Sequence, residues 1–356
     1  MSGKTGFVKR LGEIRLSKKQ KAAALSVCLL LLIIFPFIVT NKYALHVIIL
    51  CFMYACLTLS LNLIIGWSGQ FSLGHVCFYG MGAYITTLLM MNFGINFILA
   101  TIISIICTAL FSALLCYPTL RLRGDYIAVV TLGFGEVFRL FLTNEVSLTR
   151  GPAGIPSIPN PELFGLVIKG KTAYYFFALI LLAVFVVFIK RFNNSGFGMA
   201  MMTVNEDDVA ATAVGLDVRR YKLWAFCIGG GMAALMGSFY AVYMGMISPT
   251  SFAYAESIKM VSMVVLGGLG SIEGSILGAF LLAALPEVLR AFSEYRMVIY
   301  GAAMVLMMIF KPEGIWGRGR RLRNEYKIKA MRGVKDGEST GNEKRNDTVW
   351  RSACGR

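Results

Sequence analysis

One stretch of the chain matches the phosphate-binding pattern of nucleotide hydrolases at every position. It runs from Gly165 to Thr172 and reads GLVIKGKT. A phosphate-binding loop has to follow a buried strand and open a soluble helix, so that its backbone amides are free to hold phosphate. This stretch instead follows Pro159 and Pro161 and precedes a long apolar run. We interpret the match as coincidence and expect that this chain does not bind ATP itself.

One pair of residues has a spacing suited to proton chemistry. Glu136 and Arg139 lie within an apolar run and would share one face of a helix. A lone charge at the centre of a membrane helix costs about 3 kcal/mol, which favours a mutual ion pair. A proton relay in an ion-coupled transporter is the alternative. We favour the structural pair, because arginine does not titrate and holds the glutamate ionised.

The sequence gives little support for a metal site or a catalytic nucleophile. The chain has 8 cysteines but no CxxC pair, and its only histidines are His46 and His75. No Ser-His or His-acid combination falls within the apolar runs. We therefore expect no metal site and no catalytic residue.

The most informative polar segment precedes a glycine in the second half of the chain. It consists of Asn205, Glu206, Asp207, Asp208, Val209, Ala210, Ala211, Thr212, Ala213, Val214, Gly215 and Leu216. The acids would stabilise the positive end of a short helix, and Gly215 would end it. Val209, Ala210, Ala213 and Val214 would form an apolar face without a core of its own, while Ala211 and Thr212 would point toward solvent. A solvated loop helix is possible, but the apolar face suggests docking to a partner.

The elements that hold these residues are membrane helices. Hydrophobic residues make up 57% of the chain and charged residues 15%, too little charge to cover a soluble domain. The apolar residues form long runs near the 20 or so that cross a bilayer as a helix, without the alternation of a membrane barrel. We therefore predict an all-α, polytopic helical membrane protein. The predicted spans are Ala22–Val39, Tyr43–Ile65, His75–Met91, Phe97–Tyr117, Asp125–Thr143, Thr172–Ile189, Tyr221–Met246 and Met297–Phe310.

The net charge of +16 gathers at the two ends of the chain. A positive-inside bias would hold both ends in the cytoplasm, against anionic lipid headgroups. No nucleic-acid motif accompanies the charge, so we expect no nucleic-acid partner. Three regions follow: a basic cytoplasmic tail at 1–21, a transmembrane domain at 22–312 with an internal loop at 190–222, and a basic, disordered tail at 313–356.

Two glycine-rich breaks, the first at Gly66–Gly82 and the second at Gly267–Gly274, interrupt the apolar runs. In Lys259–Leu285, glycines break a simple helix at about 1 kcal/mol each relative to alanine, and we expect half-helices that re-enter at mid-depth. With this broken segment, about eight crossings leave both termini inside. Interrupted helices also indicate a solute path, although close helix packing is the alternative. The candidate path residues are Gly66, Trp67, Ser68, Gly69, Gln70, Ser72, Gly74, Gly267, Gly268 and Gly270.

Several stretches, in order along the chain, resemble the permease subunits of branched-chain amino acid ABC importers, in particular the LivM type. They are Asn62–Tyr84, Leu120–Glu136, Leu148–Pro156, the internal loop, Val265–Gly278 and Lys311–Gly317. The family's internal loop carries an arginine near its start, where this chain has Asn205. The resemblance ends at Gly317.

The resemblance implies an importer in the bacterial cytoplasmic (inner) membrane. A sister permease would complete the path, two cytoplasmic ABC ATPase subunits would use ATP, and a periplasmic substrate-binding protein would deliver leucine, isoleucine or valine. Residues 205–216 would be the coupling helix seated on an ATPase, and this chain would bind no cofactor. A permease for urea, a sugar or another small solute, or an ion-coupled secondary transporter, remains the alternative.

Overall fold

The computed structural model describes residues 32–36, 41–120, 122, 126–163, 166–288, 301, 305 and 314–315. The predicted tail at 1–21 lies outside these residues. So do most of the first and last predicted spans and most of the tail at 313–356.

Long helices account for most of the described chain. Six of them are long and apolar enough to cross a membrane: α3 (Lys42–Asn62), continued by the π-helix η1 (Leu63–Trp67), then α4 (His75–Phe93), α5 (Phe97–Thr119), α6 (Tyr126–Asn144), α8 (Lys171–Asn193) and α11 (Val218–Met244). This confirms a polytopic helical membrane protein. Their bounds lie close to the predicted spans, because long apolar runs fix a membrane helix strongly.

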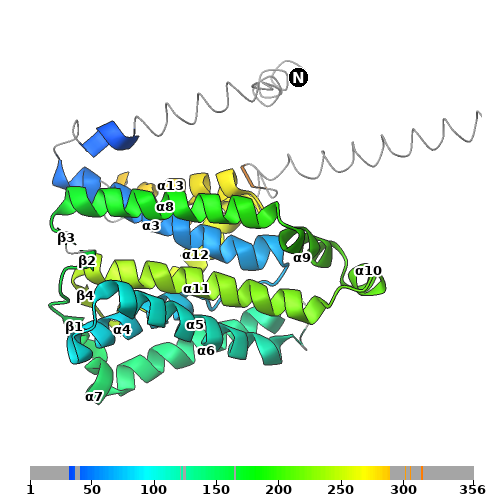
Figure 1. Ribbon diagram of the computed structural model, residues 1–356, viewed down its shortest axis with the longest axis horizontal. Helices are drawn as coiled ribbons and strands as arrows, with labels where there is room; N and C mark the ends of the chain where they lie inside the picture. The colour runs from blue at the N-terminus through cyan, green and yellow to red at the C-terminus, as the bar shows by residue number, and fades with distance from the viewer. Residues whose placement is uncertain are drawn as a thin grey trace, which may run out of the picture.

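The bundle is built around α3 and α11, whose side chains are mostly buried (Figure 1). Helix α11 packs closely on α4 through glycines. A Cβ atom at Gly82 would lie 2.2 Å from the carbonyl oxygen of Ala234, and one at Gly237 would lie 2.1 Å from that of Tyr79. Helices α5, α6 and α8 surround this centre and expose apolar side chains.

Short elements close one end of the bundle. They are α7 (Val146–Thr149), η2 (Gly151–Ala153) and two pairs of antiparallel strands, β1 (Ile155–Pro156) with β4 (Met246–Ile247) and β2 (Glu162–Leu163) with β3 (Leu166–Val167). The described residues between α6 and α8, which include four prolines, thus form short helices and strands. The described part of the GLVIKGKT match begins on β3, a two-residue hairpin strand, and ends in the first turn of α8. The strand therefore lies within the match, whereas a phosphate-binding loop follows a buried strand.

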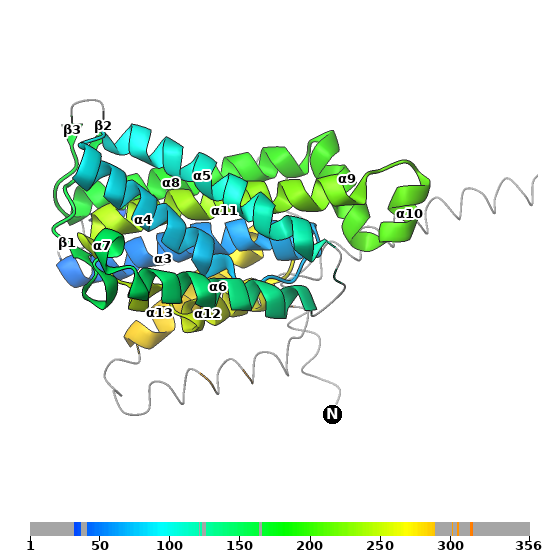
Figure 2. The ribbon, with the colours of Figure 1, turned by 90° about the horizontal axis from the view of Figure 1, so that it is seen from below.

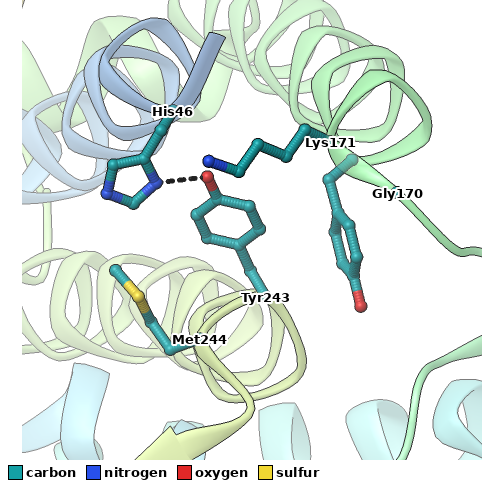
Figure 3. A pocket seen from close by; sticks show the side chains of 6 residues that line it. His46, Gly170, Lys171, Tyr243 and Met244 are labelled. Atoms are coloured by element: carbon teal, nitrogen blue, oxygen red, sulfur yellow. Dashed lines mark hydrogen bonds between the residues drawn. The ribbon is translucent and has the colours of Figure 1, made fainter. Parts of the chain in front are cut away.

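A small cavity of about 340 Å³ opens at this same end (Figure 3). Its polar side chains are engaged in joining helices. His46 Nδ1 of α3 lies 2.5 Å from the Tyr243 hydroxyl of α11, and Lys171 Nζ donates to the Lys42 carbonyl oxygen over 3.0 Å. The cavity therefore marks a junction between the first turns of α3 and α8 and the last turn of α11.

The opposite end carries α9 (Gly196–Glu206) and α10 (Asp208–Ala213), which project beyond the other helices (Figures 1 and 2). We call it the α10 end. After η3 (Pro249–Phe252), the helices α12 (Tyr254–Gly267) and α13 (Ile272–Val288) complete the fold. They are too short to count among the six spans, so the described residues do not establish about eight crossings.

Candidate functional site

The predicted docking helix is present as α10. Asp207 caps its first turn, and its Oδ1 accepts hydrogen bonds from the amides of Val209 (2.8 Å) and Ala210 (3.0 Å). Asp208 follows in that turn and pairs with Lys222 of α11. Gly215, with φ of +87°, ends the helix, and the next amide bonds back to Ala211. A short helix with acids at its start and Gly215 at its end is therefore present, as predicted, although Glu206 belongs to α9.

The apolar face of α10 is uncovered. Val209 is 80% exposed and Val214 is 74% exposed, with Ala210 and Ala213 also exposed between them. The expectation for Ala211 was wrong, because its side chain is fully buried. Helices α9 and α11 pack on that side of α10, so only the remaining sides reach solvent.

Helix α9, which the sequence did not predict, brings Asn205 to the first glycine-rich break. The Asn205 Nδ2 donates to the Gly66 carbonyl oxygen over 3.0 Å. Gly69 has φ of +73°, and a Cβ there would lie 2.2 Å from Asn205 Oδ1. Asn205 therefore fills the space that the glycine leaves open, and it joins the α9–α10 segment to the end of α3.

The two glycine-rich breaks, about 200 residues apart in the chain, meet at Asn62. Its Oδ1 accepts from the Gly270 amide (2.9 Å), and its Nδ2 donates to the Ser271 carbonyl oxygen (3.1 Å) and Ser275 Oγ (2.6 Å). A Cβ on Gly66 would lie 2.3 Å from the Gly270 nitrogen. Sequence reasoning did not identify Asn62 as a functional residue, although a polar amide one turn before a glycine break was a signal for it.

The broken segment forms an antiparallel helical hairpin. Gly267 near the end of α12 packs on Gly274, and Gly278 of α13 packs on Met263. The predicted break is present, but its predicted mid-depth location was wrong. Its bonds to Asn62 place it level with the last turns of the α3–η1 helix, at the α10 end, where Glu273 is exposed. Because Glu273 is exposed at this end of the bundle, its charged side chain does not pay the free-energy cost of burial.

Most of the candidate path residues before α4 are engaged in packing. Ser68 Oγ donates to the Ile64 carbonyl oxygen, and Gln70 Nε2 donates to Ser68 Oγ and to the Lys222 carbonyl oxygen. A Cβ at Gly74 would lie 2.2 Å from the Thr131 carbonyl oxygen. These contacts support the close-packing alternative.

Two polar atoms of that stretch are not explained by packing. The Trp67 Nε1 and Ser72 Oγ atoms are buried, and no hydrogen-bond partner for either is found in the part of the chain that the structure describes. Buried polar atoms without partners are uncommon in folded proteins. The role of this stretch in a solute path stays a prediction.

The predicted intramembrane ion pair is formed. Arg139 Nε and a terminal nitrogen each lie 2.8 Å from Glu136 Oε2. The pair sits midway along α6, with both side chains about one-third exposed.

Comparison with known proteins decides the class. Residues 43–308 match the family described as the branched-chain amino acid transport system / permease component. The chain belongs to this family. Over 311 residues, the permease is 39% identical to the high-affinity branched-chain amino acid transport system permease protein LivM of Escherichia coli strain K12, covering 81% of this chain and 73% of that protein.

Other relatives extend the comparison. The LivM protein of Salmonella typhimurium is 37% identical over 320 residues, covering 83% of this chain and 75% of the relative. The LivH permease protein of E. coli K12 is 27% identical over 292 residues, covering 74% of this chain and 91% of the relative. No solved structure matches. The resemblance seen in the sequence is thus confirmed, and relatives of this permease include two differently named permease proteins.

Proposed function

We propose that this permease is one of two membrane subunits of an ATP-driven importer of leucine, isoleucine and valine, in the bacterial inner membrane. Two cytoplasmic ABC ATPases would power it, and a periplasmic binding protein would deliver the solute. The observation that carries the proposal is the uncovered apolar face of α10, joined through Asn205 to the first glycine-rich break and from there through Asn62 to the second. The family and the names of the relatives support the solute class.

The geometry supports a mechanical route from the ATPases into the membrane. A movement of α10 would carry α9 with it, because one residue, the Asp207 cap, separates the two helices. Asn205 would transmit the shift to Gly66, and the Gly66–Gly270 contact with the Asn62 bonds would pass it to the α12–α13 hairpin. Rigid helices linked by such contacts can switch the side to which a path opens. This permease would perform no covalent step.

The energy source is testable in proteoliposomes holding this permease, a LivH-like sister permease and the ATPases. With binding protein and radiolabelled leucine outside and ATP inside, uptake should require ATP. It should persist when a protonophore collapses the proton gradient while ATP is maintained. Uptake by this chain alone, driven by an imposed pH gradient, would refute the proposal and favour a secondary transporter.

The Asn205 contact gives a sharper prediction for coupling. Asn205→Ala removes the amide that donates to Gly66 and opens a gap beside Gly69. We expect transport to fall roughly 5- to 20-fold, which corresponds to about 1–2 kcal/mol for a lost hydrogen bond and its packing. ATPase activity should fall less, so more ATP is hydrolysed for each leucine imported.

Thr203→Ala is the matched control for Asn205→Ala. Thr203 lies on α9 and is exposed, and its hydroxyl donates within that helix, to the Met199 carbonyl oxygen. Its truncation should leave the ratio of ATP to leucine unchanged. Equal ratios for the two variants would show that the Asn205 contact does not transmit motion.

A further inference from the structure

The α6–α12 corner of the bundle differs from the other outward surfaces. Helix α6 contacts α12 and η3, and Figure 2 shows α6 and α12 side by side. Apolar side chains of α6 face outward here, with Val137, Leu140 and Phe141 all exposed. Tyr254 and Ile258 at the start of α12 are also exposed. We call the surface formed by these residues and by the two ion pairs beside them the α6–α12 face.

Each helix of this face carries an ion pair that is only partly covered. Besides Glu136 and Arg139 on α6, Glu256 and Lys259 on α12 lie 3.8 Å apart, with side chains 31% and 23% exposed. The Tyr54 hydroxyl donates to Glu256 Oε2 over 2.9 Å, and Lys259 Nζ lies 4.0 Å from the centre of the Tyr54 ring. Charged groups thus reach the surface from two neighbouring helices.

Both ion pairs lie at the middle depth of the bundle. Tyr54, which holds the α12 pair, is halfway along the Lys42–Trp67 span. Glu136 and Arg139 are similarly central in Tyr126–Asn144. Charges at this depth cannot reach headgroups by extending along the membrane normal as those near helix ends do. Lipid hydrocarbon would therefore solvate the charged groups of this face poorly.

Arg139 also has more hydrogen-bond donors than the described side chains pair with. A guanidinium group has five N–H donors. Glu136 is the only acidic partner of Arg139 within the described ranges, and two donors lie close to its Oε2. In a membrane interior, the remaining donors need polar groups from water or another protein.

The peripheral helices α5 and α8 have outward surfaces whose composition suits lipid. Residues 97–119 of α5 and 172–189 of α8 contain no charged residue. Their outward side chains are mainly branched apolar ones, such as Ile106 and Leu110 on α5 and Val184 and Val187 on α8. Charge on α6 and α12 therefore separates their outward face from the outward faces of α5 and α8.

We propose that the α6–α12 face is the contact surface for the sister permease, and that polar groups of that subunit complete the hydrogen bonding of the two ion pairs. The inference rests on the proposed function, which requires a second permease subunit. The sister chain is the expected occupant over a second copy, since the relatives include two distinct permease proteins, LivM and LivH. It should present hydrogen-bond acceptors opposite Arg139.

Two valines allow a matched test. Val137 of α6 and Val187 of α8 are each 63% exposed and lie within membrane spans. A photoreactive benzoylphenylalanine would replace each in turn, in the full complex with the sister permease, ATPases and binding protein. We expect at least a tenfold higher yield of the adduct with the sister permease from position 137 than from 187. Position 258 should also give that adduct.

The other outcomes overturn the inference. Position 137 joined only to lipid would show a lipid-facing surface, and position 137 joined to a second copy of this chain would show a homodimer. A sister adduct of equal or greater yield from position 187 would place the interface on α8. Leucine uptake by the unsubstituted complex is measured alongside. Loss of leucine uptake by this complex would count against the proposed function. Normal uptake together with any of the three adduct patterns above would overturn this inference alone.

Discussion

Replacing Ala210 with arginine should abolish leucine uptake while leaving the permease inserted and assembled with its sister subunit. Ala210 lies on the exposed face of α10, between Val209 and Val214. A methyl side chain permits close approach of a partner, and a long charged one holds the surfaces apart and places an unpaired charge between them. We expect at least a hundredfold loss of transport, equivalent to about 3 kcal/mol of lost contact energy.

The matched control is Thr212→Arg, which introduces the same side chain into the same helix. Thr212 is exposed but lies on the side of α10 that carries Asp208, away from the apolar face. Uptake should stay within about twofold of the parent complex. Crosslinking from position 209 or 213 should trap an ATPase subunit, with a yield that ATP changes. Normal transport by Ala210→Arg, or equal losses for both arginines, would refute the coupling role of α10.

Asn62→Leu should destabilise the fold strongly, although the new side chain has the same branched shape as the old one. It removes an amide that bonds to Gly270, Ser271 and Ser275, and it places a methyl group against the half-buried Gly270 backbone and the buried Ser275 hydroxyl. A buried polar group left unpaired costs about 1–3 kcal/mol. Thermal unfolding in detergent should shift down by several degrees. Transport should be lost with it, because the hairpin loses its attachment to α3.

Thr108→Val provides the comparison for Asn62→Leu. Thr108 is also fully buried in a membrane helix, but its hydroxyl has no hydrogen-bond partner within the described residues. Removing that hydroxyl leaves no group newly unpaired, so the unfolding temperature should stay the same or rise. If both variants unfold at the same temperature, the Asn62 bonds do not hold the two breaks together.

Long apolar runs and local capping rules made much of this fold predictable. The helix from Phe97 was predicted within two residues of its observed end, because nothing competes with a long apolar run inside a membrane. The ends of α10 were predictable from Asp207 and Gly215, since an N-cap and a left-handed glycine act within one turn. The Glu136–Arg139 pair followed from spacing along one helix.

Features that depend on contacts between distant segments were not predictable in this way. Nothing near Ala211 in the sequence reveals that α9 and α11 cover it. The depth of the glycine break is fixed by Asn62, which lies 208 residues before Gly270. The uncovered face of α10 was inferred from its composition, but its contact with the glycine breaks required the three-dimensional position of Asn205.

The bonding of Asn62 also sets an order of events during biosynthesis. Helix α3 leaves the ribosome early, and the residues that satisfy its asparagine follow 208 residues later. At about 5–20 residues per second, this amide spends roughly 10–40 s without those partners. A chain that stops before Gly270 never acquires them. Completion of the hairpin therefore distinguishes a finished permease from a truncated one. Quality-control proteases that act on unpaired polar groups in the membrane would recognise a truncated chain by the unpaired side chain of Asn62.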